Sequence, residues 1–215
     1  MNSVPRSAAG GAPVELPTAY DPAVGFEAKR IVHVILTLDA DQVAGDQKSL
    51  RFMLAEPVDP VPDPKKESIE NYAQRIAKPR LGYNLQNARS PYDIMIQKQS
   101  WVLVELDPRL TNWQFTKGEW GCTTKGDYGR DNFGLRHVYA DRLGEVGEVV
   151  KDEGCRLLYF GVARRERGDK DAPASQYFNF HVEFLQSFKG EAAVRRMKVI
   201  FDPDVGNNGG FPIPP

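Results

Sequence analysis

The segment Gln176–Gln186 alternates between apolar and polar side chains over its whole length. One face carries three phenylalanines and a valine, namely Phe178, Phe180, Val182 and Phe184. The other face carries Tyr177, Asn179, His181 and Glu183. A period of two is that of a β-strand, so the pattern predicts a strand with one side in a core and the other toward water or a ligand. This segment therefore favours a β fold.

Other parts of the chain repeat this signal. Further strands are predicted at Arg30–Leu38, Leu50–Leu54, Tyr92–Gln97, Trp101–Leu106, Trp113–Trp120, Leu135–Ala140, Arg156–Arg164 and Val194–Asp202. Arg30–Leu38 is apolar on nearly both faces, which is typical of a strand in the middle of a sheet. Tyr92–Gln97 and Trp101–Leu106 flank a short polar turn, so we expect these two to form a hairpin.

One helix interrupts the strands. Ser68 can cap a helix over Ile69–Ala77, and Pro79 prevents the helix from continuing. Its apolar stripe consists of Ile69, Tyr72, Ala73 and Ile76. Many short strands and one helix predict an all-β fold, an antiparallel β-sandwich with one short helix. We expect the sandwich domain at residues 30–205, a flexible N-terminal arm at 1–29, and a flexible Gly/Pro-rich tail at 206–215.

The charges nearly cancel. The 215 residues include 28 Lys+Arg and 29 Asp+Glu, for a formal net charge of −1. Such a balance supplies no broad attraction for nucleic acid or anionic lipid, so we expect neither as a partner. The first 29 residues lack the apolar run of a secretory signal. With only two cysteines, Cys122 and Cys155, we expect a cytoplasmic protein with reduced thiols, and a disulfide between them is the alternative.

The residues that commonly bind metals are dispersed. The three histidines stand alone, without metal-binding spacing, so we predict no resident cofactor. His33 is interpreted as a hydrogen-bonded core residue. Asp202, Asp204 and Asn208 place oxygen ligands near one another, as a calcium loop does, and form a candidate calcium site. The alternative is that these residues only terminate strands and make turns.

A second candidate site is rich in aromatic residues. Trp113, Trp120 and Tyr128 lie in a stretch with many polar residues. The hydrogen-bonding residues beside them are Asp127, Asp131 and Asn132. An aromatic face with polar neighbours is typical of a carbohydrate site, so a lectin-like module is one hypothesis. The alternative is that both tryptophans pack in the core, and this would require Gly118 to break the strand between them.

A third candidate site is the polar face of Gln176–Gln186. His181 and Glu183 share this face two residues apart, and a carboxylate beside a histidine raises its proton affinity. An enzyme with a site assembled around these two residues is therefore another hypothesis, with Tyr177 and Asn179 as neighbouring ligand-binding candidates. The sequence contains no nucleophile elbow and no phosphate-loop motif, so we assign no catalytic residues.

Three stretches resemble the bacterial inclusion-body protein family named for PixA and AidA: Ile31–Val43, Tyr177–Leu185 and Phe201–Val205. The resemblance implies a non-enzymatic β-sandwich that is abundant in the cytoplasm, self-associates and binds carbohydrate. Our leading hypothesis is accordingly a non-catalytic protein that forms a homo-oligomer or binds a partner in the bacterial cytoplasm. A glycan-binding module and an enzyme are the alternatives.

Overall fold

The computed structural model describes most of the predicted domain. The described residues are 26–39, 43–44, 47–48, 51–78, 84–89, 94–96, 98–118, 120–124, 132–144, 150–151, 153–163, 175–187, 194–201 and 204–207. Most of the predicted arm and tail lies outside them, so the domain bounds stay predictions. Among the described residues, no helix is long and apolar enough to cross a membrane.

The described chain is largely β, as predicted, with helix α1 (Ile69–Ala77) as its helix. The first sheet has the order β10-β11-β7-β1-β4-β5, formed by Asn132–Val138, Leu157–Val162, Ser100–Leu106, Arg30–Asp39, Arg51–Pro57 and Leu85–Arg89. The second has the order β13-β12-β14-β6, formed by Arg195–Phe201, Ser175–Gln186, Asp204–Asn207 and Ile94–Ile96. Strands β8 (Trp113–Phe115) and β9 (Cys122–Thr124) also pair with β12, and β2 (Val43–Ala44) pairs with β3 (Gln47–Lys48).

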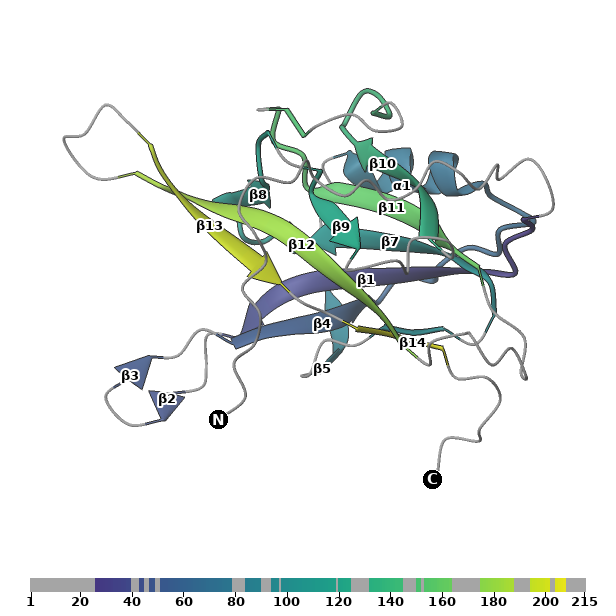
Figure 1. Ribbon diagram of the computed structural model, residues 1–215, viewed down its shortest axis with the longest axis horizontal. Coiled ribbons are helices and arrows are strands. Elements are labelled where there is room, and N and C mark those ends of the chain that lie inside the picture. The colour runs from purple at the N-terminus through teal and green to yellow at the C-terminus, as the bar shows by residue number, and fades with distance from the viewer. Residues whose placement is uncertain are drawn as a thin grey trace.

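Strand β1 lies inside the first sheet, as its two apolar faces predicted (Figure 1). It pairs antiparallel with β4 and parallel with β7. A second parallel pair joins β14 and β6, so the prediction of a purely antiparallel fold is wrong at both pairs. The predicted hairpin is also wrong, because β6 and β7 belong to different sheets. The polar turn between them carries the chain from one sheet to the other.

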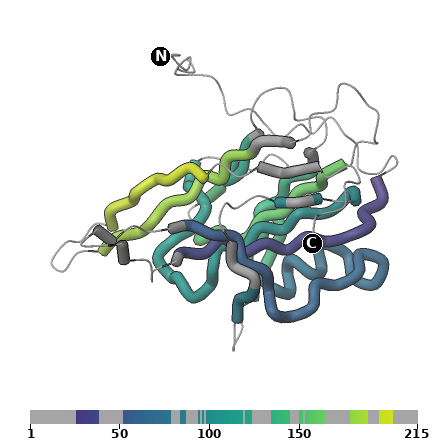
Figure 2. The backbone as a smooth tube through the Cα atoms, turned by 90° about the horizontal axis from the view of Figure 1, so that it is seen from below, coloured from purple at the N-terminus to yellow at the C-terminus, as the bar shows by residue number. Residues whose placement is uncertain are grey.

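The molecule is layered, with α1 on one side of the first sheet and β12 and β13 on the other (Figure 2). The main core cluster combines side chains from both sheets, and the alternation in β12 places Phe178, Phe180 and Val182 in it. A smaller cluster joins α1 to the opposite face of the first sheet. The first sheet is therefore covered on both faces, and its central strands can hold buried polar groups only where these find partners.

Helix α1 forms where its sequence predicts it. The Ser68 side chain accepts a hydrogen bond from the backbone N–H of Asn71, and the helix ends before the extended Lys78. Its buried residues are Ile69, Tyr72, Ala73 and Ile76, the predicted stripe. The stripe is apolar apart from the hydroxyl of Tyr72, which is thereby brought against the sheet.

Both tryptophans of the predicted aromatic site lie in the main core. Trp113 is 1% exposed and Trp120 is 8% exposed. Gly118 has a φ of 77°, a conformation that suits glycine, and it ends the extended run after β8. The structure thus agrees with the alternative that both tryptophans pack in the core, with a break in the strand at Gly118. Because both rings are buried, neither presents an exposed face to a sugar.

Strands β1 and β4 separate at one end. Their pairing runs from Asp39↔Arg51 to Ile35↔Ala55. Strand β4 then shifts register and continues alongside β5, where Pro57 pairs with Leu85. The proline-rich stretch that follows leads the chain away to α1. The sheet therefore forks beside the first half of β1, and this fork opens a cavity.

Candidate functional site

Two pairs of buried polar side chains lie on the face of the first sheet that α1 covers. Alternation along the strands places His33 and Thr37 of β1 on this face, together with Glu105 of β7 and Asp107 directly after it, and all four are at most 5% exposed. Acidic residues are rarely buried this completely unless they are paired. We call these four residues, with Tyr72 of α1, the helix-side network.

His33 is held at both ring nitrogens. Its Nε2 lies 2.9 Å from Glu105 Oε2, and its Nδ1 lies 2.8 Å from the Tyr72 hydroxyl oxygen. An ionised carboxylate can only accept, so it assigns a proton to Nε2. Nδ1 then accepts the Tyr72 O–H when the ring is neutral and donates to the hydroxyl oxygen when it is charged. The arrangement fixes the ring and joins three groups that can each donate or accept a hydrogen bond.

Asp107 organises the end of β7. Its carboxylate accepts hydrogen bonds from Thr37 Oγ1 at 2.5 Å and from the Arg109 guanidinium at 2.7 Å, as well as from the Arg109 backbone N–H. Burial alone would raise the pKa of Asp107, but these hydrogen bonds and the Arg109 charge outweigh it, so its pKa lies below its ordinary value. Asp107 therefore carries a buried negative charge that keeps Arg109 close.

The backbone of the same corner binds a second arginine. The Asp107 carbonyl oxygen accepts from Arg156 Nη2 at 2.6 Å, and the Leu110 carbonyl oxygen accepts from the same nitrogen at 2.5 Å. Trp113 Nε1 also donates to the Asp107 carbonyl, at 3.1 Å. The turn after β7 is thus tied to the core, and Arg109 and Arg156 both lie at the end of β7.

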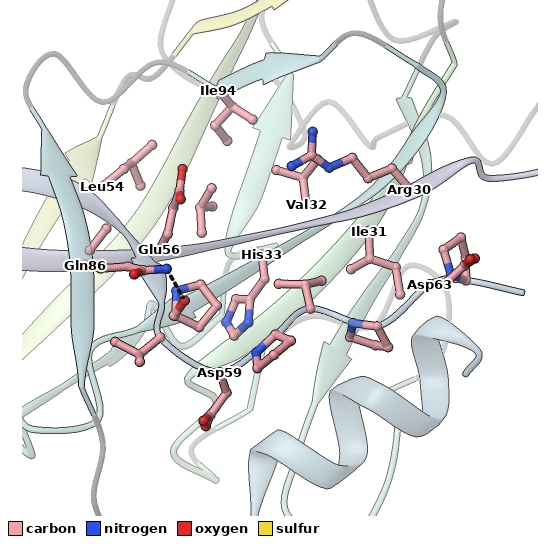
Figure 3. A pocket seen from close by; sticks show the side chains of 18 of the residues that line it. Arg30, Ile31, Val32, His33, Leu54, Glu56, Asp59, Asp63, Gln86 and Ile94 are labelled. Carbon is pink, nitrogen blue, oxygen red and sulfur yellow. Dashed lines mark hydrogen bonds between the residues drawn. The ribbon is translucent and has the colours of Figure 1, made fainter. Parts of the chain in front are cut away.

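The larger of two cavities beside the network lies at the fork between β1 and β4, and we call it the fork cavity. Its volume is about 630 Å³, and its lining includes His33 and the proline-rich stretch 57–64. Figure 3 shows His33 and Asp59 on one side of β1, and Arg30 on the other. Gln86 Nε2 donates to the Pro57 carbonyl at 3.1 Å and holds the wall of the fork.

The second cavity lies at the end of β7, and we call it the β7-end cavity. Its volume is about 400 Å³, and its walls are the last residues of α1, the end of β7, and the stretches 138–140 and 153–157. Four charged residues line it: Lys78, Glu105, Glu153 and Arg156. Glu153 pairs with Arg142 at 2.7 Å and Glu105 contacts His33, so each carboxylate has a partner, and Lys78 and Arg156 add positive charge. Both cavities fall in the size range of small-molecule sites.

The His33–Glu105 contact joins the two cavities. His33 lines the fork cavity, Glu105 lines the β7-end cavity, and their side chains touch at 2.9 Å. A group bound in either cavity would thus lie next to one end of the same hydrogen-bonded pair.

The two residues of the predicted enzyme site bind different neighbours. His181 Nε2 lies 2.8 Å from Thr123 Oγ1 of β9. Glu183 is 1% exposed and accepts from Gln114 Nε2 at 2.6 Å and from the Arg196 guanidinium. Their partners belong to three other strands, which is typical of cross-strand pairs that stabilise a sheet.

The remaining predicted residues are described only in part. Asn179 is half-buried on β12, and the backbones of Tyr177, Asn132 and Asp204 lie in β12, β10 and β14. Asp127, Tyr128, Asp131, Asp202 and Asn208 lie outside the described residues. The calcium site therefore stays a prediction, and the described residues contain no cluster of three metal-binding side chains. Cys122 and Cys155 are buried thiols without a disulfide, and burial raises the pKa of Cys122.

Residues 63–210, more than half of the chain, match the model of a protein family called pNTSase1. The chain belongs to the pNTSase1 family. The description of this family is a predicted novel nucleotide synthetase. No curated protein matches the chain significantly.

The predicted membership of the PixA/AidA inclusion-body family is wrong, because the chain matches the pNTSase1 model instead. Three short strands carried that resemblance, and short strands with apolar alternation occur in unrelated β proteins.

The pNTSase1 match also changes the functional hypotheses. The non-catalytic, self-assembling, inclusion-body-like role is wrong, because the matched family is described as a synthetase. The enzyme alternative agrees better with this description. Every residue that lines the β7-end cavity falls within 63–210, whereas His33 and most of the fork cavity precede it. The lining of the β7-end cavity therefore lies wholly within the matched residues.

Sequence reasoning missed Glu105, Asp107 and Tyr72 as site residues. One signal was present, because the apolar strand at 101–106 ends in Glu-Leu-Asp, which places two carboxylates on one face. Acids at the end of a strand also make turns in many proteins. Their buried partners on β1 and α1 lie far away in the sequence.

Proposed function

We propose that the protein is an enzyme of nucleotide synthesis whose reaction centre is the β7-end cavity. One observation carries the proposal: the cavity within the family match is lined by a buried carboxylate, Glu105, together with two basic residues, Lys78 and Arg156. We also propose that the two sheets form a sandwich over the shared core, and we retain the predicted cytoplasmic location.

The basic residues suit a phosphate-bearing substrate. Lys78 is exposed at the end of α1, and Arg156 is anchored by two backbone carbonyl groups. Lysine and arginine bind phosphate oxygens through charge-assisted hydrogen bonds, which are about twice as strong as neutral ones. A nucleoside triphosphate bound here would place its phosphates near Lys78 and Arg156 and close to Glu105.

Glu105 is the proposed general base. It is 5% exposed, lines the cavity, and contacts an imidazole that can share the proton it takes up. A base placed in this way removes the proton of a nucleoside hydroxyl group whose oxygen attacks the γ-phosphorus of the triphosphate. The bond between that phosphorus and its bridging oxygen breaks, and the nucleoside diphosphate leaves. Such catalysis contributes about 10²- to 10⁴-fold to a rate. His33 and Tyr72 orient the carboxylate and act as positioning residues.

Product analysis tests this proposal. The purified protein would be incubated with Mg²⁺ and each of ATP, GTP, CTP and UTP, alone and with the four nucleosides. Anion-exchange chromatography and mass spectrometry would then identify the products. We expect a nucleotide that is neither in the starting mixture nor a hydrolysis product of the triphosphate, formed at least about 100-fold more slowly by Glu105→Gln, which keeps the size of the side chain. Asp141→Asn, an exposed change outside both cavities, is the matched control and should retain the wild-type rate.

Two results would overturn the proposal. Failure to form a new nucleotide from any mixture would remove the proposed activity. Wild-type turnover by a folded Glu105→Gln protein would remove Glu105 from the reaction.

A further inference from the structure

The fork cavity has the volume of a small-molecule site, and its lining differs from that of the β7-end cavity. At about 630 Å³ it is larger than the β7-end cavity, and its walls combine proline rings with charged side chains. The proline-rich stretch of its wall ends in a hydrogen-bonded turn, in which Lys65, Lys66 and Glu67 all donate backbone N–H groups to Asp63. A preformed cavity of this size is the usual form of a small-molecule site.

Acidic residues outnumber basic ones in the lining of the fork cavity. Its charged residues are Lys29, Arg30, Glu56, Asp59 and Asp63. Lys29 forms an ion pair with Glu27, and Figure 3 shows Arg30 across β1 from His33 and Asp59 on the side of His33. Three carboxylates thus accompany two cations, one of which is already paired, and this balance disfavours phosphate.

We propose that the His33 side of the fork cavity binds the uncharged nucleoside portion of a second substrate. Carboxylates accept hydrogen bonds from sugar hydroxyl groups, and the rings of Pro60 and Pro62 offer apolar surface to a base. His33 lines the cavity with its side chain fully buried, so a hydroxyl group bound there would approach the His33–Glu105 pair without displacing it. The assignment deepens the proposed function, because it gives the acceptor a place separate from the phosphate donor.

Isothermal titration with adenosine, guanosine, cytidine, uridine and ribose, each without a triphosphate, tests the assignment. We expect at least one nucleoside to bind. In Lys78→Ala, which lacks a basic residue of the β7-end cavity, adenosine 5′-monophosphate should bind more weakly than adenosine because of the acidic lining of the fork cavity. Asp59→Asn keeps the size of an exposed side chain and should weaken nucleoside binding about tenfold. Asp141→Asn, the matched control, should bind like the wild type.

Three results would overturn the assignment. The first is heat of binding from none of the nucleosides. The second is a nucleoside affinity that Asp59→Asn leaves unchanged, and the third is tighter binding of the monophosphate than of adenosine in Lys78→Ala. The titration needs no turnover, so its failure is distinguishable from failure of the proposed enzyme. Nucleoside binding without any synthesis would support this site and contradict the proposed activity. Synthesis without binding at Asp59 would support the activity and contradict this site.

Discussion

The two cavities beside α1 share one hydrogen-bonded pair but differ in almost every other respect. The fork cavity lies where β1 and β4 separate, has more acidic than basic residues in its lining, and mostly precedes the family match. The β7-end cavity lies at the end of β7, has Lys78 and Arg156 in its lining, and lies wholly within the match. In our proposal this difference assigns the two cavities to two substrates, with His33 and Glu105 between them.

The largest expected effect concerns the shared pair. Glu105→Ala should lower the free energy of unfolding by about 3 kcal/mol, because it removes the buried acceptor of the His33 ring and leaves a void. Urea denaturation followed by tryptophan fluorescence measures the change.

The control is Glu153→Ala, which breaks the exposed pair with Arg142 and should cost less than about 1 kcal/mol. Equal losses for the two variants would show that the buried pair contributes no more than a surface pair does.

The next effect separates the cavities by charge. Lys78→Ala should raise KM for the nucleoside triphosphate about tenfold, since one charge-assisted hydrogen bond to phosphate is lost, and should leave nucleoside binding unchanged. Steady-state kinetics measures KM, and Lys98→Ala, an exposed lysine outside both cavities, is the control. A larger effect on nucleoside than on triphosphate binding would reverse our assignment of the two sites.

A smaller effect concerns pH and Asp107. Because the pKa of Asp107 is lower in the folded protein than in the unfolded chain, its charge stabilises the fold above the ordinary pKa. That stabilisation is lost as the pH falls through the folded pKa. The difference in the free energy of unfolding between the wild type and Asp107→Asn should therefore shrink as the pH falls from about 5 to about 2. Urea denaturation across this range would contradict the account if the difference stayed constant.

The smallest expected effect on stability concerns the exposed Arg75–Glu67 pair at α1. Arg75 donates to Glu67 at 2.8 and 3.0 Å, and hydrogen bonds from Arg75 lower the pKa of Glu67. Because Arg75 is exposed, Glu67→Gln should change the free energy of unfolding by less than about 0.5 kcal/mol, and salt should reduce the difference. A loss of nucleotide synthesis in this variant would extend the site beyond the two cavities.

Local sequence patterns predicted the elements but not their partners. The alternation of β12 and the stripe of α1 are set by residues next to one another, so both are confirmed with the predicted buried faces. Strand pairing depends on residues far apart, and the hairpin predicted for 92–106 is wrong for that reason. Sequence analysis considered His181 with Glu183 because they are two residues apart, whereas His33 and Glu105 are 72 apart and touch. A candidate site formed across strands has no local pattern to show it.

The central claim is that catalysis depends on Glu105 and not on the polar face of β12. Rates of nucleotide synthesis by Glu105→Gln and Glu183→Gln, measured side by side on proteins of equal stability, test it most directly. We predict a loss of about 100-fold or more for Glu105→Gln and a rate within about twofold of the wild type for Glu183→Gln. A large loss confined to Glu183→Gln would contradict the account and move the site to the other sheet.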